Sequence, residues 1–519
     1  MNNFFKKNIL LILIGIILLS VFLRFYKLGE KSFVADEFLG VNTTYGYLQT
    51  GEWKRWDFNL EKPYKDKPYF KTIFDLDIWN GGEDTYTRAW IYNWQVAQSL
   101  KFFPDVQEWS YRVVGAVWGV FSVLIIYLIT TKMTGKKEIG FMAAILLAVS
   151  IDSIEFSRKI RMYTMFMPIF FAFIYFAFKF IESRKKSSFN FINKFRKKTG
   201  LNLIFILPTI ILGTLSIHLH LLAANFVFIL SIYLVTMGTI FYKKEGQLKN
   251  RYFIYLILLG VSGWLLSFSS GAFLSGLGIQ DNISYFSKSF FDYSNPILVI
   301  GLMVLGSYHL VKNKLEEGVF ITVSYLVILL GAIFLWDRNT GSQYLFFAKP
   351  FQIILIAGGI WAVANFLKEN LKKYNKKVYL FSIVTFLLIV PNSSYFFQDE
   401  NAYTQTARSS NPNYNKVFGY FIKEKNDNDV LISRNFRNFY WRGSKTKTVS
   451  LGGERATKEE KKITQEKLEK IMSENTSGWI IYSDNDENFI SKKAQRFIEK
   501  NLEKVSNSRV RGPISVYRW

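Results

Sequence analysis

Long blocks of apolar residues constrain the fold of this chain more than any other feature of its sequence. A helix needs about 17–25 mainly apolar residues to cross the hydrocarbon core of a bilayer, whereas soluble domains spread such residues in amphipathic patterns. About eleven blocks reach or approach this length; they lie at residues 8–23, 111–131, 138–151, 162–181, 201–217, 219–241, 252–270, 294–311, 317–336, 344–366 and 376–396. The sequence therefore predicts a mainly α-helical, polytopic transmembrane bundle in residues 1–396.

The first apolar block resembles a signal peptide in one respect, because Lys6 and Lys7 precede it. No small-x-small cleavage site follows the block before the pair Asp36 and Glu37, so we interpret it as an uncleaved first span. The chain contains no cysteine, which excludes disulfides, thiolate metal ligands and a cysteine nucleophile.

The formal net charge of +25 could indicate a nucleic-acid partner. The basic residues, however, concentrate in alternate loops between the blocks, at residues 132–137, 184–198, 243–251, 312–314 and 368–377. Cytoplasmic loops of membrane proteins carry such an excess of Lys and Arg. We therefore expect an integral protein of the plasma membrane with a cytoplasmic N-terminus, and the charge requires no nucleic acid.

Two adjacent carboxylates, Asp36 and Glu37, follow the first block and would lie where the chain leaves the membrane. Such a pair can be solvated, can hold a loop by pairing with Arg or Lys, or can serve as a base or metal ligand. The pair belongs to a long outer loop, residues 24–110, where Trp and Tyr at helical spacing predict an interfacial helix at about 84–100. This helix either rests on the membrane or forms a wall of a substrate groove.

The second outer loop carries cations on the face where the positive-inside rule disfavours them. Arg158, Lys159 and Arg161 lie in one stretch of four residues, close to Asp152 and Glu155. The cations either pair with these two carboxylates or bind an anion such as a lipid phosphate, whose oxygens the fork of an Arg side chain fits.

Three ionisable residues lie near or within later apolar blocks. His218 and His220 flank Leu219 near the outer face; their spacing can suit a metal, but no third ligand is evident, and pore-facing or capping roles are equally compatible. Lys349 lies about a turn and a half into the tenth block, where its ammonium must snorkel to the surface or meet an anion.

Residues 397–519 have the mixed composition of a soluble domain. Strand-like runs alternate with amphipathic stretches, the former at 430–432, 448–451, 479–482 and 514–517 and the latter at 414–425, 456–473 and 487–504. This alternation predicts a small extracytoplasmic α/β domain with mainly parallel strands. It contains no Gly-x-Gly-x-x-Gly motif, so a nucleotide site is unsupported, and we favour a structural or acceptor-docking lid.

Several short motifs resemble, in their order along the chain, those of the GT-C polytopic glycosyltransferases. Within that superfamily they are most similar to the protein O-mannosyltransferases and the aminoarabinose transferases that modify lipid A. The motifs are Arg24-Phe25-Tyr26-Lys27-Leu28-Gly29 with Ala35-Asp36-Glu37, Arg88 to Trp94, Tyr111-Arg112-Val113-Val114-Gly115, Glu155 to Tyr163, His218-Leu219-His220, and Gln343-Tyr344 to Pro350. The resemblance covers residues 8–395 and rests on the order of the motifs more than on any single one.

The resemblance implies transfer of a sugar from a polyprenyl-phosphate donor to an acceptor on the outer face, with inversion at the anomeric carbon. It implies Asp36 as the catalytic base, with Glu37 beside it in the catalytic site. The remaining matched residues take two roles: donor-phosphate binding for Arg158, Arg161, Tyr163, Arg338 and Lys349, and acceptor or loop positioning for Arg88, Asp152, Glu155 and Tyr344. His218 and His220, with Asp36 or Glu37, could hold a divalent metal ion, and no other cofactor is implied.

One departure from the family pattern affects the donor site, because Gln343 replaces the usual Arg before Tyr344 and its phosphate role would pass to Arg338 or Lys349. The alternatives are a transporter or flippase of lipid-linked sugars, an inactive scaffold, and transfer or polymerisation of a preassembled oligosaccharide. Transporters tend to place polar groups at the bilayer midplane and often show inverted repeats. Here the ionisable clusters lie in outer loops and no repeat is evident, so we favour the transferase.

Overall fold

The computed structural model describes residues 2–64, 89–104, 106–246, 250–269, 278–337, 340–371, 375–405, 409, 411–452, 462–505 and 514–519. The chain folds as two units. The helical unit comprises Met1–Tyr26, Thr72–Tyr92 and Val113–Tyr395, and the mixed unit comprises Lys27–Lys71, Asn93–Arg112 and Phe396–Trp519.

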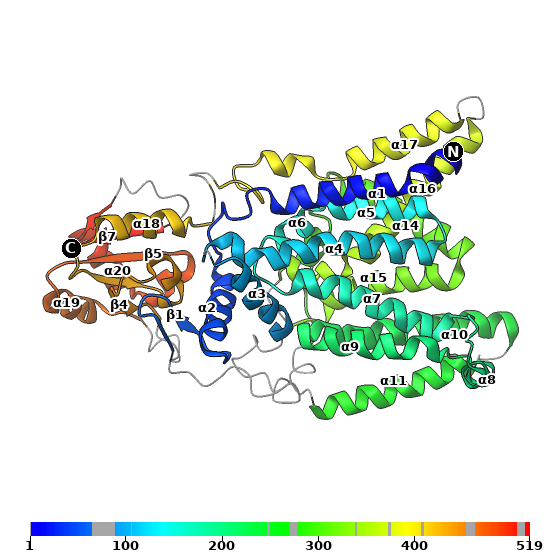
Figure 1. Cartoon of the computed structure of the whole chain (residues 1–519), viewed down its shortest axis with the longest axis horizontal. Coiled ribbons are helices and arrows are strands. Elements are labelled where there is room, and N and C mark those ends of the chain that lie inside the picture. Colours follow the sequence, from blue (N-terminus) through cyan, green and yellow to red (C-terminus); the bar gives the residue numbers. More distant parts are fainter. Residues whose placement is uncertain are drawn as a thin grey trace. The chain divides into compact units, whose positions relative to one another are not determined.

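Helices at the predicted apolar blocks build the helical unit (Figure 1). They are α1 (Asn2–Phe25), α5 (Lys137–Ala148), α6 (Ile151–Ser157), α7 (Tyr163–Glu182), α8 (Asn190–Thr199), η3 (Leu203–Phe205), α9 (Ile206–Leu219), η4 (Leu221–Ala224), α10 (Asn225–Glu245), α11 (Asn250–Ser269), α13 (Ser284–Ser289), α14 (Pro296–Asn313), α15 (Leu315–Phe334), η5 (Ser342–Tyr344), η6 (Phe346–Ala348), α16 (Lys349–Asn370) and α17 (Asn375–Ile389). Two further helices, α3 (Trp90–Phe102) and α4 (Glu108–Thr134), have residues in both units.

Six helices among the described residues are long and apolar enough to cross a membrane, and the number rises to eight if each of two bent pairs forms one span. The first pair is α5 with α6, bent by 57°, and the second is α8 with Leu203–Leu219, bent by 110°. Three shorter apolar helices occupy the other predicted blocks, at Leu10–Phe25, Tyr252–Val261 and Lys377–Ile389. The structure thus supports a polytopic helical protein, with six to eight spans by length and composition where the sequence predicts about eleven.

The bend between α5 and α6 has a local cause. Ser150 adopts an extended backbone conformation and its hydroxyl accepts a hydrogen bond from the Ser153 amide at 3.2 Å, which starts a new helix. Arg24 donates to the carbonyl oxygens of Leu147 and Ala148 at 3.2 and 3.1 Å, which satisfies the last turn of α5. The bend therefore ends one helix and begins another just before the basic stretch predicted to bind phosphate.

Glycines allow α14 and α16 to pack very closely. A Cβ atom added at Gly306 would lie 1.9 Å from the Leu355 carbonyl oxygen, and one added at Gly359 would lie 2.0 Å from that of Leu302. Small residues permit this approach of two backbones, which favours helix association in membranes. The contact fixes the position of α16, the helix that begins at Lys349.

Gly306→Ala is expected to destabilise the protein by about 1–3 kcal/mol, because the added methyl group must push α14 and α16 apart. Gly301, on the same helix, offers a matched control, since a Cβ atom there meets no atom within 4 Å. Gly301→Ala should keep or raise stability, because Ala is the better helix former. Thermal unfolding of both purified variants checks this, and equal melting temperatures would contradict the close packing.

A five-stranded sheet with the order β4-β3-β5-β7-β6 organises the mixed unit. Its strands and flanking helices are α18 (Tyr414–Glu424), β3 (Val430–Ser433), η9 (Asn435–Trp441), β4 (Lys447–Ser450), α19 (Gln465–Glu474), β5 (Gly478–Ser483), η10 (Asp484–Phe489), α20 (Lys492–Asn501), β6 (Glu503–Lys504) and β7 (Ile514–Arg518). β3 pairs in parallel with β4 and β5, whereas β7 pairs antiparallel with β5 and β6. The expectation of mainly parallel strands is thus corrected to a mixed sheet, because the last strand runs back along both of its neighbours.

The two faces of this sheet follow the alternation of side chains along the strands. Val430 and Ile432 pack in one core with Leu468 of α19 and Ile498 of α20. The other face packs against α18, where the rings of Phe421 and Trp479 lie 5.6 Å apart. The mixed unit also contains α2 (Ala35–Thr50) and a short antiparallel pair, β1 (Trp56–Asp57) with β2 (Lys62–Pro63).

Candidate active site

Asp36 and Glu37 both lie in the first turn of α2, but their side chains differ in environment. Glu37 is fully buried and Asp36 is exposed. The Glu37 carboxylate accepts hydrogen bonds from Arg112 Nε at 3.0 Å, from Arg112 Nη2 at 2.9 Å and from the Val34 amide at 2.9 Å. The bond from the Val34 amide closes the N-terminus of α2 as the acidic residue of a capping box does.

Arg112 fixes the segment before α2 as well as the helix itself. Its guanidinium donates to the carbonyl oxygens of Leu28, Lys31 and Ser32 at 3.2, 2.7 and 3.1 Å, respectively. Together with the two bonds to Glu37, these contacts use all five N–H groups of the side chain. They give Glu37 a structural role, and its predicted catalytic role stays a prediction that these contacts do not favour.

Two phenylalanines hold the start of α2 in place. Phe33 packs against the ring of Phe439 at 5.0 Å, and Phe38 packs against that of Phe436 at 5.4 Å. Both phenylalanines are fully buried. Asp36 therefore lies on the exposed side of a helix start whose buried phenylalanines are fixed by packing. A base that acts on a bound substrate must be held in place in this way.

Arg158 directly follows α6 and is 6% exposed. Its Nη1 donates to the carbonyl oxygens of Arg24 and Tyr26 at 3.0 and 2.7 Å, at the C-terminal end of α1. A cation at this position satisfies the last carbonyls of a helix and opposes the negative end of its dipole. This contact accounts for the burial of Arg158, so its predicted phosphate contact stays a prediction with a structural alternative.

Four predicted site residues come together from three segments of the helical unit. The Arg161 guanidinium carbon lies 5.5 Å from the ring centroid of Tyr163. The Tyr163 ring lies 5.5 Å from that of His220 and 6.4 Å from that of Tyr344, and the rings of His220 and Tyr344 lie 6.3 Å apart. We call Arg161, Tyr163, His220 and Tyr344 the Arg161 cluster.

His220 has a defined tautomer in this cluster. Its ring is 7% exposed, and Nδ1 accepts a hydrogen bond from the Leu222 amide at 3.1 Å. In the neutral imidazole the proton is therefore assigned to Nε2. The Arg161 cluster accordingly combines a guanidinium, an imidazole N–H and two phenol hydroxyls, which are the donor types that bind phosphate oxygens.

Lys349, the first residue of α16, lies between two buried carboxylates. Its Nζ is 3.1 Å from Asp152 Oδ2 and 3.2 Å from Asp292 Oδ2, and the lysine is 4% exposed. Asp292 also accepts from the Ser150 hydroxyl at 2.5 Å and from the Asp152 amide at 2.9 Å. We call Asp152, Asp292 and Lys349 the Lys349 cluster. Its two carboxylates already face the ammonium, which disfavours the phosphate-binding role predicted for Lys349, and that role stays a prediction.

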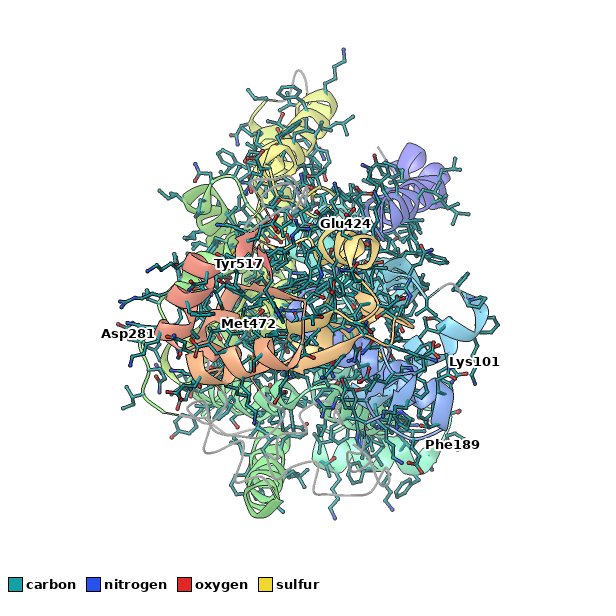
Figure 2. The ribbon with its side chains drawn as sticks, turned by 90° about the vertical axis from the view of Figure 1, so that its left-hand side faces the viewer. Lys101, Phe189, Asp281, Glu424, Met472 and Tyr517 are labelled. Carbon is teal, nitrogen blue, oxygen red and sulfur yellow. The ribbon has the colours of Figure 1, made fainter. Side chains whose placement is uncertain are left out.

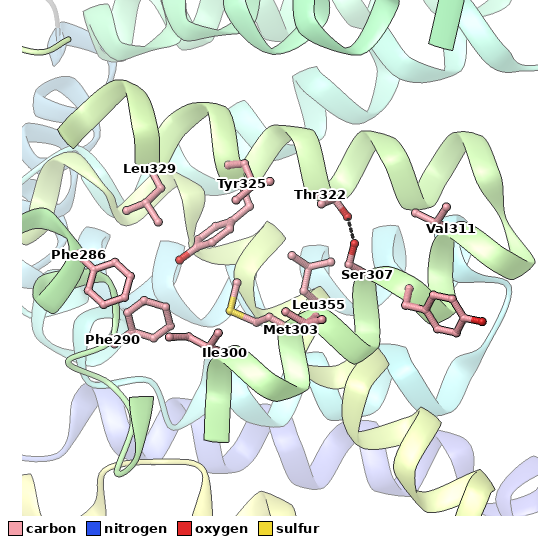
Figure 3. Close-up of a pocket in the computed structure, with 13 residues that line it drawn as sticks. Phe286, Phe290, Ile300, Met303, Ser307, Val311, Thr322, Tyr325, Leu329 and Leu355 are labelled. Carbon is pink, nitrogen blue, oxygen red and sulfur yellow. Dashed lines mark hydrogen bonds between the residues drawn. The ribbon is translucent and has the colours of Figure 1, made fainter. Parts of the chain in front are cut away.

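A cation–π contact followed by hydrogen bonds leads from the Lys349 cluster to a pocket between α14 and α15. The Tyr293 ring lies 5.4 Å from Lys349 Nζ, and its hydroxyl donates to Gln352 Oε1 at 3.1 Å. Gln352 Nε2 then donates to the Tyr325 hydroxyl at 3.2 Å. Tyr325 is one of the residues that line the pocket (Figure 3).

The pocket is mostly apolar and has a volume of about 540 Å³. Aromatic and aliphatic side chains such as Phe290, Met303 and Leu355 form most of its wall. The polar groups in the wall are the hydroxyls of Tyr325 and Tyr308 and a pair of hydroxyls, Ser307 and Thr322, that bond to each other at 2.8 Å (Figure 3). Such a wall suits a hydrocarbon ligand.

The histidines do not complete a metal site in the part of the chain that the structure describes. No group of three or more His, Cys, Asp or Glu side chains lies close enough there to hold an ion. His220 uses Nδ1 for the Leu222 amide, and the predicted further ligands, Asp36 and Glu37, belong to the other unit. No step proposed below uses a metal.

The remaining predicted residues fall into three groups. Glu155 pairs with Lys159 at 3.4 Å and accepts a hydrogen bond from the Tyr395 hydroxyl, so this carboxylate is paired within the unit. Arg88 and Arg338 lie outside the described residues. Asp36 belongs to the mixed unit and the Arg161 cluster to the helical unit, so their convergence on one substrate stays a prediction.

Sequence reasoning assigned no role to Asp292 or Arg112, although both hold the site together. For Asp292 a signal existed, because Lys349 within an apolar block requires an anion and Asp292 stands shortly before the block that begins near residue 294. For Arg112 the signal was weaker, since it only opens the second apolar block. Nothing in the spacing pairs it with Glu37 rather than with Asp36.

Comparison with known proteins gives one family match. Residues 87–195 match the dolichyl-phosphate-mannose-protein mannosyltransferase family. No curated protein matches the chain by sequence. The matched stretch includes Asp152, Glu155, Arg158, Arg161 and Tyr163.

Solved structures extend the likeness to nearly the whole chain. AglB, an oligosaccharyltransferase from Archaeoglobus fulgidus solved with an inhibitory peptide and a dolichol-phosphate, has a TM-score of 0.58 at 11% identity, covering 93% of this chain and 70% of that one. ArnT from Cupriavidus metallidurans has a TM-score of 0.54 at 9% identity in the apo state, covering 99% of this chain and 98% of ArnT. ArnT bound to undecaprenyl phosphate has a TM-score of 0.52 at 8% identity, covering 97% of each chain. The expected resemblance to the GT-C superfamily is therefore confirmed, and the chain is a polytopic membrane protein with the fold of the GT-C glycosyltransferases.

Proposed function

We propose that the protein transfers a sugar from a polyprenyl-phosphate donor to a hydroxyl acceptor at the extracytoplasmic surface of its membrane. The observation that carries this proposal is a shared fold over nearly the full length of ArnT, which has been solved with undecaprenyl phosphate. AglB, which has a similar fold, has been solved with a dolichol-phosphate. Both lipids join a phosphate to a long isoprenoid chain, so the donor proposed here has the same chemical design.

The proposed topology has eleven spans and a cytoplasmic N-terminus, with the C-terminal domain, residues 397–519, on the outer side. The first bent pair, the Leu203–Leu219 part of the second pair and the three shorter apolar helices complete the set begun by the six long helices. The supporting observation is the distribution of Lys and Arg, which gather in alternate loops between the spans.

In this proposal the Arg161 cluster holds the donor phosphate and the apolar pocket receives part of its isoprenoid chain. Arg161 supplies a permanent positive charge, while Tyr163, Tyr344 and His220 Nε2 supply hydrogen-bond donors. The pocket wall of aromatic and aliphatic side chains matches a hydrocarbon chain in character. The contacts from Tyr325 through Gln352 and Tyr293 lead from the pocket to the Lys349 cluster, which belongs to the same unit as the Arg161 cluster.

The reaction is a direct displacement with Asp36 as the general base. The acceptor hydroxyl oxygen forms a bond to the anomeric carbon while the bond from that carbon to the phosphate oxygen breaks. The hydroxyl proton moves to the Asp36 carboxylate, and polyprenyl phosphate leaves with the bonding electron pair. Arg161 stabilises the negative charge that grows on the leaving phosphate, and attack opposite the leaving group inverts the anomeric centre.

Arg161→Gln is expected to weaken binding of undecaprenyl phosphate by about tenfold to a hundredfold, the usual value of a hydrogen bond to a charged group. Native mass spectrometry of the full-length protein in detergent measures this affinity. Lys159→Gln is the matched control, because Lys159 is a cation of the same turn whose ammonium pairs with Glu155 at 3.4 Å. Equal affinities of the two variants would contradict the assignment of the phosphate site.

A vesicle assay tests the reaction itself. Full-length protein is reconstituted with a labelled polyprenyl-phosphate sugar and a mixture of cell-envelope acceptors, and both products are measured. The proposal expects free polyprenyl phosphate and glycosylated acceptor in equal amounts. Movement of the labelled lipid across the bilayer without either product would instead identify a flippase.

A further inference from the structure

The amphipathic helix α8 has no apolar face buried in the described part of the helical unit. None of its residues, Asn190 to Thr199, is buried. Phe191 within the helix is 72% exposed, and Phe189, the residue just before the helix, is 69% exposed. Figure 2 labels Phe189, which lies at the edge of the ribbon. Large aromatic side chains with this exposure need a partner in an apolar or interfacial environment.

The charge around α8 is entirely positive. Seven cations lie between residues 183 and 205, namely Arg184, Lys185, Lys186, Lys194, Arg196, Lys197 and Lys198. No Asp or Glu occurs in the sequence from 183 to 244. Among the described residues none of these seven side chains forms an ion pair with a carboxylate, and only Arg196 has a recorded side-chain bond, to the Arg184 carbonyl oxygen. The helix therefore carries uncompensated positive charge beside exposed aromatic rings.

The neighbouring elements place α8 at a membrane boundary. It connects α7 with α9, and both belong to candidate spans. The bend of 110° between α8 and the following helix turns α8 nearly perpendicular to that span. The loop that leads into α8 is fixed rather than free, because Asn193 Nδ2 donates to the Ser187 carbonyl oxygen at 2.7 Å and Asn202 Nδ2 to that of Lys185 at 2.9 Å. A helix that meets a membrane span at this angle runs close to the plane of the membrane.

Helix α20 in the mixed unit shows what an ordinary amphipathic helix of this chain looks like. It also has ten residues and four exposed cations, Lys492, Lys493, Arg496 and Lys500. Its apolar side chains Ala494 and Ile498 are buried in the core of the sheet domain. In α8, by contrast, Ile192 and Phe195 are only half-buried, and Phe189 and Phe191 remain exposed among the described residues.

We infer that α8 is an interfacial anchor that binds the headgroups of anionic lipids. Phe189 and Phe191 enter the headgroup–acyl boundary, while Lys194, Lys197 and Lys198 contact lipid phosphates on either side of the helix. Basic amphipathic helices bind membranes through these two contributions, buried apolar area and attraction to anionic lipid. The anchor is separate from the proposed transfer reaction and concerns a different ligand, the bulk anionic lipid.

The absence of cysteine makes a sharp test available, because a single engineered cysteine can be labelled uniquely. Asn190→Cys, in the full-length protein, carries an environment-sensitive fluorophore at the start of α8. The protein is placed in nanodiscs of phosphatidylcholine and phosphatidylglycerol in which one lipid or the other carries a brominated, quenching chain. We expect stronger quenching by brominated phosphatidylglycerol than by brominated phosphatidylcholine at equal mole fraction, and a loss of this preference at high salt.

Neutralising the cations tests the cause of the preference. Each cation at an anionic surface contributes about fivefold to binding, so replacing Lys194, Arg196, Lys197 and Lys198 by Gln should lower the preference for phosphatidylglycerol by on the order of tenfold or more. The control replaces Lys492, Lys493, Arg496 and Lys500 by Gln, which removes the same charge from α20 and should leave the preference unchanged. Equal quenching by the two lipids, or a preference that survives the α8 changes, would overturn the inference. Unaltered circular dichroism of each variant confirms that it is folded.

Discussion

Asp36→Asn is expected to lower the kcat of sugar transfer by about 10²–10⁴-fold, which is the usual contribution of general base catalysis. The substitution keeps the size and shape of the side chain and replaces the carboxylate, which can take up the acceptor proton, by a neutral amide, which cannot. Asp36 is exposed on a helix start that Phe33, Phe38 and Glu37 hold from the other side. The variant should therefore unfold at the same temperature as the parent protein and bind the donor lipid with the same affinity.

Glu37→Gln is the matched control, because it makes the same chemical change at the adjacent residue. For Glu37→Gln the expected loss is in stability, in contrast to Asp36→Asn, whose stability should not change. The loss should be about 3–5 kcal/mol, because Arg112 would be left buried beside a neutral partner. Thermal unfolding separates the two variants, and transfer from a lipid-linked sugar in vesicles gives the rates. Full turnover by folded Asp36→Asn protein would remove Asp36 as the base and with it the mechanism proposed here.

The contrast between these two carboxylates shows what the sequence can and cannot predict. Adjacent residues on a helix point about 100° apart, so one of a pair at a helix start faces the core and the other faces outward. The sequence places Asp36 and Glu37 together and cannot decide which is which. That decision depends on Arg112, which lies 75 positions from Glu37 in the chain and is brought to it only by the fold.

The apolar blocks were predicted far more completely than the site. A span is a local property of about twenty residues, and every predicted block contains a helix. The five-stranded sheet was predicted to the level of its four longer strands, Val430–Ser433, Lys447–Ser450, Gly478–Ser483 and Ile514–Arg518. The first three are parallel as expected, and only the direction of Ile514–Arg518 differs from the prediction. Strand direction depends on how the chain returns to the sheet, and hydrophobic pattern does not record it.

The basic stretch after α6 illustrates the same limit in electrostatics. The sequence left two interpretations for its cations, internal pairing and phosphate binding. In the structure each of the three cations makes a different contact. Arg158 donates hydrogen bonds to the end of α1, and Lys159 pairs with Glu155. Arg161 lies against Tyr163 in the Arg161 cluster. The pair of Lys159 with Glu155 has the i,i+4 spacing of a helix. Spacing alone could not assign Arg158 or Arg161, because their contacts join segments that are remote in sequence or depend on the turn between α6 and α7.

Lys349→Met is expected to destabilise the protein by about 3–5 kcal/mol, because it leaves two buried carboxylates without their common cation. Lys349 Nζ now lies 3.1 Å from Asp152 and 3.2 Å from Asp292, in a site with almost no exposure to solvent. Lys368→Met is a suitable control, because Lys368 lies in the last turn of the same helix and is only partly buried. Its effect on the melting temperature should be small.

The two aspartates are expected to differ, and this difference tests the geometry of the cluster. Asp152→Asn leaves Asp292 and Lys349 as a neutral pair, so it should cost little by itself and should recover part of the stability lost in Lys349→Met when the two changes are combined. Asp292→Asn should cost more, because Asp292 also receives the Ser150 hydroxyl and the Asp152 amide and so holds the start of α6. Thermal unfolding of the single and double variants measures these couplings. Additive effects of Lys349→Met and Asp152→Asn would show that the ammonium is not shared between the carboxylates. The Lys349 cluster would then not explain what holds α6 and the turn after it, which carries Arg161, in place.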